Sequence, residues 1–97
     1  MRTRFEWDEA KARANLAKHG VSFELARRVW DDPFYDLIRQ MEDGEERWLA
    51  IGLVASETLL LVVHVNRGGD EDEQIVRIVS ARKATRHERT RYEQQAP

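Results

Sequence analysis

The first third of the chain has the apolar and polar spacing of two helices. Residues 9–18 (EAKARANLAK) are strong helix formers, and Asp8 before them is a favoured N-cap. Gly20 is expected to end this helix, because glycine adopts the left-handed conformation of a C-cap at little cost. A second helix is expected over residues 23–30, with Ser22 as its N-cap. The expected apolar faces are Ala10, Ala14, Leu16 and Ala17 in the first helix and Phe23, Ala26, Val29 and Trp30 in the second.

The spacing of apolar and polar residues changes after Pro33 and becomes typical of β-strands. A polar turn with a glycine at residues 42–45 separates two strands, as a hairpin requires. The third strand is apolar on both faces, so we expect it at the centre of the sheet. Residues 5–7 are interpreted as a short extended lead-in to the first helix. The four expected strands cover residues 34–41, 47–55, 58–66 and 74–81.

The last helix is almost entirely polar. Thr85 and Glu88 fit a capping box, which predicts a helix that runs to about Gln94. Tyr92 is its one sizeable apolar side chain, so burial of an apolar face cannot hold this helix in place. Together the elements predict an α+β fold with two N-terminal helices, an antiparallel β-meander of about four strands and a C-terminal helix.

Length and composition narrow the class of protein. Ninety-seven residues, 1–97, are expected to form a single domain. The absence of cysteine excludes disulfides and thiolate metal sites and favours a reducing cytoplasm. The start of the chain has no apolar run of the signal-peptide kind, and the longest apolar run, Leu59–Val63, is far too short to span a membrane. We therefore expect a cytoplasmic protein without membrane partners.

The net charge of −2 hides a segregation of charge along the chain. Residues 1–30 carry seven basic and four acidic side chains, and residues 74–97 carry six and two. Residues 31–73 carry three basic and twelve acidic side chains. A polyanion should therefore meet the two ends and a basic partner the middle. A balanced surface without function is the other interpretation, because charge runs are usually just solvated.

Two stretches could bind phosphate. Lys11, Asn15 and Lys18 form one polar ridge on the first helix, joined by His19, although such ridges usually just face water. Arg67 and Arg77 should lie close together across the hairpin, since opposed residues in a ladder are about 5 Å apart. Guanidinium groups this close repel each other unless an anion, or a carboxylate such as that of Glu46, lies between them. Separate pairing of each arginine with the acids of residues 70–73 is the alternative.

A third candidate lies where the last strand meets the last helix. Arg82 and Lys83 precede a helix N-terminus, whose free amides and dipole attract anions. Arg82 is five residues from Arg77, which is about 16 Å along a strand. One compact site can contain both only if the strand bends or the ligand is long, as a polynucleotide is.

Other classes of site have no support in the sequence. His19, His64 and His87 lie far apart and lack a metal-ligand pattern. There is no phosphate-binding glycine-rich loop followed by lysine and no Gly-x-Ser-x-Gly motif. His64 lies among valines in a strand and is better interpreted as a hydrogen-bonded histidine of the core or its rim than as a base. We expect neither a metal nor another cofactor.

Several motifs resemble the BrnT family, the toxins of type II BrnT/BrnA toxin–antitoxin systems. They extend over nearly the whole chain, and the combination of W-D-x-x-K-x-x-x-N-x-x-K-H-G near the start with I-V-S-A-R-K-A near the end is specific. Two features depart from the family: His64 stands where members usually carry an aromatic residue, and the turn from Gly68 to Gln74 is longer and more acidic. The matching residues are Phe5–Asp8, Lys11, Asn15, Lys18–Phe23, Glu46, Arg47, Gly52, Arg67, Gly68, Arg77–Thr85, Glu88, Arg89 and Tyr92.

The resemblance implies a small cytoplasmic ribonuclease with a RelE-like fold. It also implies neutralisation by a BrnA-like antitoxin that carries its own DNA-binding domain, so that operator DNA is contacted only through the toxin–antitoxin complex.

RNA can be cut without a metal when its 2′-hydroxyl attacks the neighbouring phosphorus, and cations then stabilise the extra negative charge of the transition state. We hypothesise that Arg67, Arg77 and Arg82 form this clamp. Glu46 and His19 are candidate bases by residue type. The RNA-binding candidates are Lys11, Lys18, Lys83 and Arg86.

Two other functions fit parts of the sequence. A non-catalytic module could bind RNA or a protein through the same basic patch, which the lack of an obvious base favours. A DNA-binding regulator acting alone could place the polar last helix in a major groove. No helix-turn-helix pattern supports that regulator, and the acidic middle of the chain argues against it.

Overall fold

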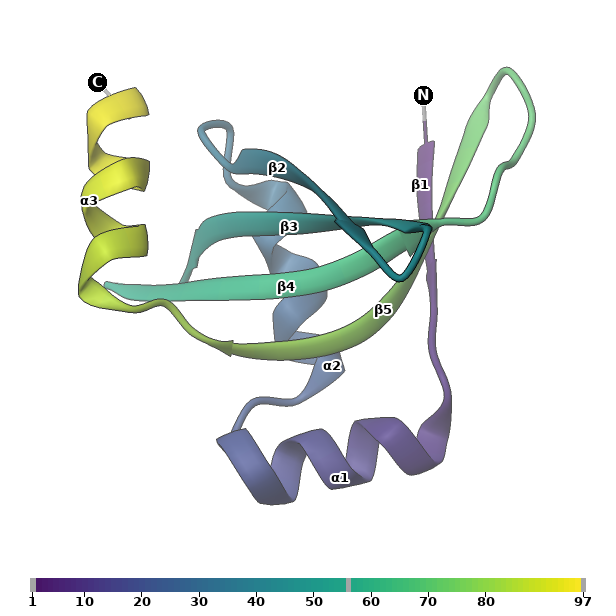
Figure 1. Ribbon diagram of the computed structural model, residues 1–97, viewed down its shortest axis with the longest axis horizontal. Helices are drawn as coiled ribbons and strands as arrows, with labels where there is room; N and C mark the ends of the chain where they lie inside the picture. The colour runs from purple at the N-terminus through teal and green to yellow at the C-terminus, as the bar shows by residue number, and fades with distance from the viewer. Residues whose placement is uncertain (1, 56, 97) are drawn as a thin grey trace.

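A five-stranded mixed sheet forms the centre of the molecule (Figure 1). The computed structural model describes residues 2–55 and 57–96. The strands lie in the order β1-β5-β4-β3-β2, and β1 is parallel to β5 while the other neighbours are antiparallel. The elements are β1 (Arg2–Glu6), α1 (Glu9–His19), α2 (Phe23–Ala26), the 3-10 helix η1 (Arg27–Asp31), β2 (Asp36–Glu42), β3 (Glu45–Val54), β4 (Thr58–Asn66), β5 (Glu73–Lys83) and α3 (Arg86–Gln95).

The expected fold of two N-terminal helices and a four-strand antiparallel meander was wrong. The chain begins with a strand, β1, which pairs in parallel with β5 and makes the sheet mixed and five-stranded. Phe5 and Glu6 of the stretch interpreted as a lead-in belong to that strand, and Trp7 follows it. Phe5 and Trp7 pack into the core while Arg4 and Glu6 face the other side, which is the alternation of a strand with one buried face.

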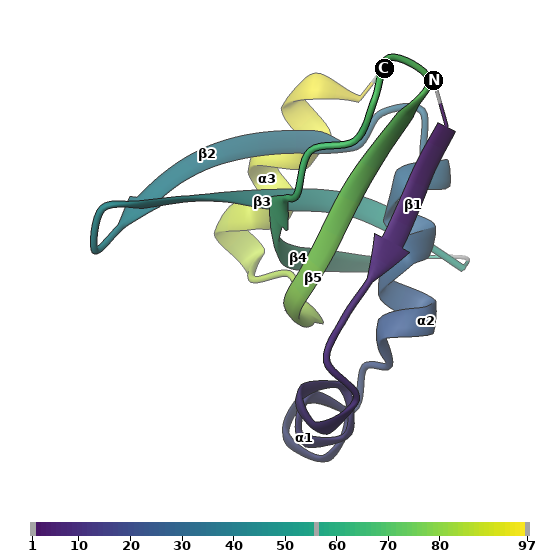
Figure 2. The same cartoon turned by 90° about the vertical axis from the view of Figure 1, so that its right-hand side faces the viewer.

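One face of the sheet carries the larger core and is covered by α2 and η1 (Figure 2). Phe23, Ala26 and Val29 are fully buried there against apolar residues of β3, β4 and β5. Gly52 lies under η1, where an added Cβ would come within 2.7 Å of a Val29 methyl carbon. This glycine therefore allows η1 to pack closely on β3.

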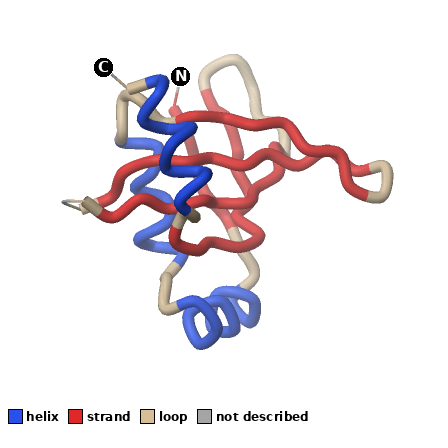
Figure 3. The backbone as a smooth tube through the Cα atoms, turned by 60° about the vertical axis from the view of Figure 1, so that its left-hand side comes forward, coloured by secondary structure: helices blue, strands red, loops and turns tan. Residues whose placement is uncertain are grey.

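The opposite face of the sheet is covered by α3 (Figure 3), and a smaller hydrophobic core lies between α3 and the sheet. Tyr92 packs against Ile51, Leu59 and Leu61, and its hydroxyl donates to the buried Asp32 carboxylate at 2.6 Å. The capping box of Thr85 and Glu88 is present as the sequence predicted. As its polar sequence indicated, α3 depends on Tyr92 and on polar contacts.

The helix α1 lies along the edge of β5 beyond the end of β1 (Figure 1). The expected apolar face of α1 was wrong, because those side chains are exposed and Leu16 is 51% exposed. The buried residue is Asn15, whose amide donates to the carbonyls of Val21 and Ala81 and accepts from the N–H of Ala81. A side-chain amide thus replaces the neighbouring strand that β5 lacks at this point.

In the described part of the chain, no helix is long and apolar enough to cross a membrane.

Candidate functional site

A β-bulge in β5 brings Arg77 and Arg82 onto the same face of the sheet. His64 pairs with Ile78 but Val63 pairs with Ser80, so one extra residue is inserted in β5. In a regular strand, two residues five apart would point to opposite faces. The bulge reverses the alternation, and both arginines, with Ser80 between them, face the side on which α3 packs.

Arg67 and Arg77 converge on one carboxylate, that of Glu6. Oε1 of Glu6 lies 3.4 Å from Nε of Arg67 and 3.7 Å from Nη1 of Arg77. The side chains of Glu6 and Arg77 are about one third exposed, and that of Arg67 is 59% exposed. The two arginines are not directly opposed, because Arg77 pairs with Val65 and Arg67 lies two residues further along. The result is an open pair of cations with one anion between them.

Arg82 is held by a different carboxylate. Its Nη1 and Nη2 donate to the two oxygens of Glu88 at 2.8 and 2.9 Å, a bidentate pair. The hydrogen bonds with Arg82 lower the pKa of Glu88, and the same bonds raise the pKa of Arg82. Arg82 therefore stays charged and is fixed in direction, but one side of its guanidinium is already occupied.

The start of α1 approaches the arginine pair. Asp8 accepts from the backbone N–H of Lys11 at 3.0 Å as the N-cap of α1. This hydrogen bond is the main favourable cause of the lowered pKa of Asp8, and the charges of Lys11 and Arg77 lower it further. Lys11 and Arg77 thus act on the same carboxylate, which places the first turn of α1 beside the site.

The remaining α1 candidates flank Asn15. Lys11 lies four residues before it and Lys18 three after it, so both share the side of the helix that contacts β5. Both lysines are exposed, and His19 is half-buried in the last turn. The interpretation of this ridge as purely solvated does not hold at its centre, because Asn15 is buried.

The structure does not bring Glu46 to the arginines. Its carboxylate accepts from Arg39 Nε at 2.7 Å and from Trp48 Nε1 at 3.2 Å. Trp48 pairs with His64 on the α2 side, so strand alternation places Glu46 on the opposite face of the sheet from Arg77. The carboxylate between the arginines is that of Glu6 and not that of Glu46.

Lys83 and Arg86 also lie outside the pair of arginines. Lys83 pairs with Leu60, which belongs to the α2-side core, and it lines a depression of about 170 Å³ beside the start of α3. Arg86 is the exposed first residue of α3. Lys83 therefore lies on the α2 side of the sheet, whereas Arg77 and Arg82 face the α3 side.

Sequence reasoning missed Glu6 because the N-terminal strand was missed. The signal was present: polar and apolar residues alternate from Arg4 to Trp7, as in a strand with one buried face.

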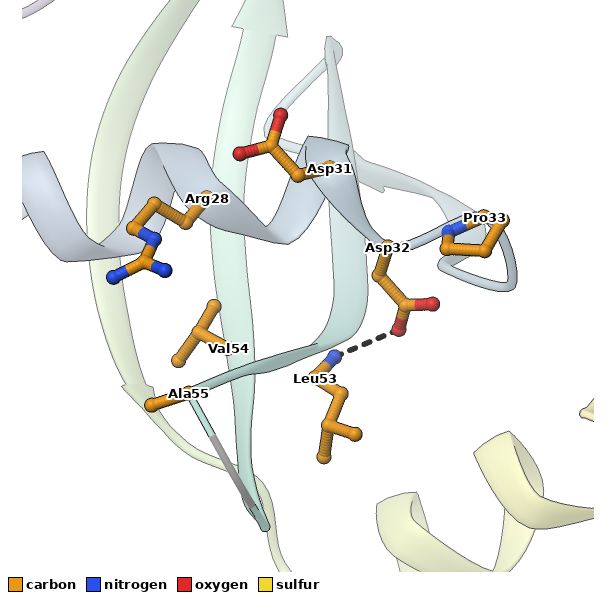
Figure 4. A pocket seen from close by; sticks show the side chains of 7 residues that line it. All are labelled: Arg28, Asp31, Asp32, Pro33, Leu53, Val54 and Ala55. Atoms are coloured by element: carbon orange, nitrogen blue, oxygen red, sulfur yellow. Dashed lines mark hydrogen bonds between the residues drawn. The ribbon is translucent and has the colours of Figure 1, made fainter.

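A cavity of about 250 Å³ lies elsewhere, between η1 and the end of β3 (Figure 4). The Asp32 carboxylate accepts there from the N–H of Leu53 at 2.8 Å. The lining residues are Arg28, Asp31, Asp32, Pro33, Leu53, Val54 and Ala55. None of them is a predicted site residue, and no group of three metal-ligating side chains occurs among the described residues.

The family model described as "Ribonuclease toxin, BrnT, of type II toxin-antitoxin system" matches residues 7–88. The chain belongs to the BrnT family. This confirms the resemblance given by the sequence motifs. The chain is therefore a member of a family of ribonuclease toxins of type II toxin–antitoxin systems, whose partner is an antitoxin protein and whose substrate is RNA.

The fold is similar to that in a crystal structure of the Brucella abortus ribonuclease toxin, BrnT. The TM-score is 0.66 and the sequence identity 23%, and the match covers 89% of this chain and all of that one. At this identity the likeness shows a shared fold. No curated protein matches the chain significantly.

Proposed function

We propose that this BrnT family member is a metal-independent endoribonuclease whose phosphate clamp is formed by Arg67 and Arg77. The observation that carries the proposal is their convergence on one carboxylate oxygen of Glu6. A phosphodiester presents anionic oxygens much as a carboxylate does, and the fork of an arginine suits both. Glu6 therefore keeps the cations together in the free protein and gives way when RNA binds.

The proposed reaction is transfer of the phosphoryl group to the 2′-hydroxyl of the same nucleotide. The 2′-oxygen forms a bond to phosphorus, the bond from phosphorus to the 5′-oxygen breaks, and the leaving oxygen takes up a proton. The products are a 2′,3′-cyclic phosphate and a 5′-hydroxyl end. Negative charge grows on the phosphoryl oxygens in the transition state, where a well-placed donor is worth about 3–4 kcal/mol.

Arg82 supports the clamp from further along β5. Because the bulge turns it to the same face as Arg77, a polynucleotide lying on this face reaches both. Lys11 and Lys18 on the neighbouring edge are suited to hold the flanking backbone. Lys83 and Arg86 would contact RNA only where it continues past the end of β5.

Two groups are placed to take the 2′-hydroxyl proton, namely Glu6 and His19. Glu6 is at the clamp itself, whereas His19 lies on the β5-facing side of α1. Single-turnover cleavage rates of Glu6→Gln and His19→Gln tell them apart, because removal of the base should lower the rate by about 10²–10⁴-fold. The other substitution should leave the rate much closer to that of the wild type.

The proposed partner is a BrnA-like antitoxin that carries the DNA-binding domain, so that operator DNA is contacted only through the complex. The proposed place of action is the cytoplasm, and the proposed unit is a single domain over residues 1–97.

A non-catalytic RNA- or protein-binding module is the second candidate. The pairing of all three arginines with carboxylates in the free protein favours it. It predicts salt-sensitive RNA binding without cleavage.

The decisive experiment is cleavage of single-stranded RNA by the purified chain in excess EDTA. We expect cleavage to persist, and Arg67→Ala and Arg77→Ala each to lower the rate by about 10²–10³-fold. Arg39→Ala is the matched control, because Arg39 is also paired with a glutamate but on the other face. Loss of activity on chelation, or equal rates in all three variants, would contradict the proposal.

A further inference from the structure

Strand β2 forms one edge of the sheet, and no described strand pairs with its outer side. The sheet ends at β1 on one side and at β2 on the other. Strand β1 has five residues, whereas β2 has seven, DLIRQME, with no proline among them. Strand β2 therefore offers the longer row of backbone groups to a partner strand.

Apolar side chains are concentrated beside this edge. The described residues include five large apolar side chains that are exposed, and three of them are Phe34, Leu37 and Met41. Leu37 is 43% exposed and Met41 57% exposed. Both point to the same face of β2, with Arg39 between them, because strand residues two apart share a face. A partner that covered this strip would bury both side chains.

The outer part of the β2–β3 hairpin extends away from the helices (Figures 2 and 3). Asp43 and Gly44 form its turn, both with positive φ, as tight hairpin turns require. The arm is therefore accessible from several sides.

The hairpin is acidic. Over residues 36–48 it has five acidic and two basic side chains, a net charge of −3. Arg39 pairs with Glu46 and Arg47 with Glu42, which leaves Asp43 and Glu45 without an ion pair among the described residues. Two copies of this arm would repel each other, so charge favours a basic partner over a second copy of the chain.

We propose that the β2–β3 hairpin is the docking arm for the antitoxin, which adds a basic, partly apolar strand along the free edge of β2. Main-chain hydrogen bonds would supply affinity, and Leu37 and Met41 would receive the apolar side chains of the added strand. The inference rests on the proposed function for the identity of the partner. It places that partner on a different part of the molecule from the arginine pair.

The test measures binding of the protein encoded beside this chain, purified and titrated against the intact chain. The double variant Leu37→Lys/Met41→Lys places two positive charges on the strip and should weaken binding by at least tenfold. Leu16→Lys is the control, because Leu16 is similarly exposed but lies on α1. It should bind within twofold of the wild type. Equal affinity of the double variant and the wild type would overturn the proposal.

The charge of the arm is tested separately. Glu42→Gln/Asp43→Asn/Glu45→Gln should slow association severalfold and reduce its dependence on salt. The control Glu24→Gln/Glu71→Gln/Glu93→Gln removes three exposed acids elsewhere and should leave the rate unchanged. Light scattering shows whether the arm instead binds a second copy of the chain. The proposal is overturned if the wild type is a dimer, the Leu37/Met41 double variant is a monomer, and both bind the partner protein with equal affinity.

RNA cleavage by each free variant separates this inference from the proposed function. The Leu37/Met41 variant should cleave RNA at the wild-type rate but escape inhibition by the partner. A wild-type chain that binds the partner at this arm without cleaving RNA would count against the ribonuclease and leave the docking surface standing.

Discussion

Asn15 joins the first helix to the sheet through a single amide. Its side chain makes three hydrogen bonds to the backbone of Val21 and Ala81, and it is 6% exposed. Strand β1 does not extend as far as Ala81, so the buried N–H and C=O of Ala81 would have no hydrogen-bond partner on that side without Asn15. The position of Lys11 and Lys18 beside β5 therefore depends on this residue.

Asn15→Ala should destabilise the protein by about 2–3 kcal/mol, because it leaves buried backbone groups unpaired. Urea unfolding followed by circular dichroism measures the change. Asn66→Ala is the control, since Asn66 is exposed and accepts one hydrogen bond from Gln74, and it should cost less than about 0.5 kcal/mol. A loss no greater than that of the control would show that α1 is held by other contacts.

His64 is a buried imidazole without a hydrogen-bond partner among the described residues, so the expectation of a hydrogen-bonded histidine was wrong. Both ring nitrogens are buried and unpaired, and the ring packs edge-on against Trp30 at 4.8 Å between centroids. Burial lowers the pKa of His64 to about 4. The folded state therefore keeps the imidazole neutral, whereas the unfolded chain takes up a proton below its ordinary pKa of about 6.5.

Stability should fall as the pH decreases from about 6.5 towards 4, because the unfolded state then binds more protons than the folded state. The contribution of His64 is up to about 3 kcal/mol over this window. His64→Phe keeps an aromatic ring at this position and should remove that part of the pH dependence. Urea unfolding of both proteins at pH 7 and pH 5 measures it, and identical pH profiles would refute the assignment.

At the scale of elements, α3 is fixed by polar contacts along its length. Glu88 holds Arg82, Arg91 Nε donates to Asp36 at 2.7 Å, and Tyr92 donates to Asp32. Burial and the hydrogen bond to Asp32 raise the pKa of Tyr92 to about 12, so the hydroxyl remains a donor at neutral pH. The position of α3 is thus linked to that of Arg82, because Glu88, the partner of Arg82, lies on α3.

Tyr92→Phe should destabilise the protein by about 1–2 kcal/mol and speed amide exchange in α3 more than elsewhere. Hydrogen exchange resolved by residue measures this effect. Tyr35→Phe is the matched control, because the Tyr35 hydroxyl makes no hydrogen bond within the described residues. Uniform exchange across all elements in Tyr92→Phe would argue that α3 does not open as a unit.

At the scale of the whole molecule, a net charge of −2 means that long-range attraction to RNA is weak. On the proposed function, RNA binding comes from the cations that lie beside β5 and on α1. The acidic hairpin lies at the other edge of the sheet, so repulsion of RNA there and attraction of a basic protein follow from the same distribution.

The affinity for single-stranded RNA with 2′-deoxy substitution, which cannot be cleaved, should fall with salt by about 0.7 log units per log unit for each phosphate contacted. Lys11→Ala/Lys18→Ala should lower this slope by about 1.4 if both lysines contact phosphates. Arg13→Ala/Arg28→Ala removes the same charge from other exposed positions and should leave the slope almost unchanged. Equal slopes in the two double variants would exclude α1 from the RNA surface.

Local signals fixed the features whose partners are neighbours in the chain. The caps at Asp8, Ser22 and Thr85 and the left-handed Gly20 were confirmed, because each depends on hydrogen bonds within a few residues. The family was likewise recognisable, because its motifs are contiguous stretches of sequence. The sequence alone therefore determined where the helices begin and which family the chain belongs to.

Tertiary structure decided what depends on partners far away along the chain. The pairing of β1 with β5, the carboxylate of Glu6 between Arg67 and Arg77, and the bond of Asn15 to Ala81 all join residues more than sixty positions apart. The direction of Arg82 depended on one inserted residue in β5, because a shift by one residue turns a strand side chain to the other face. The spacing of apolar residues indicates which side chains are buried. Which strands, ion pairs and hydrogen bonds join distant residues depends on how the sheet assembles.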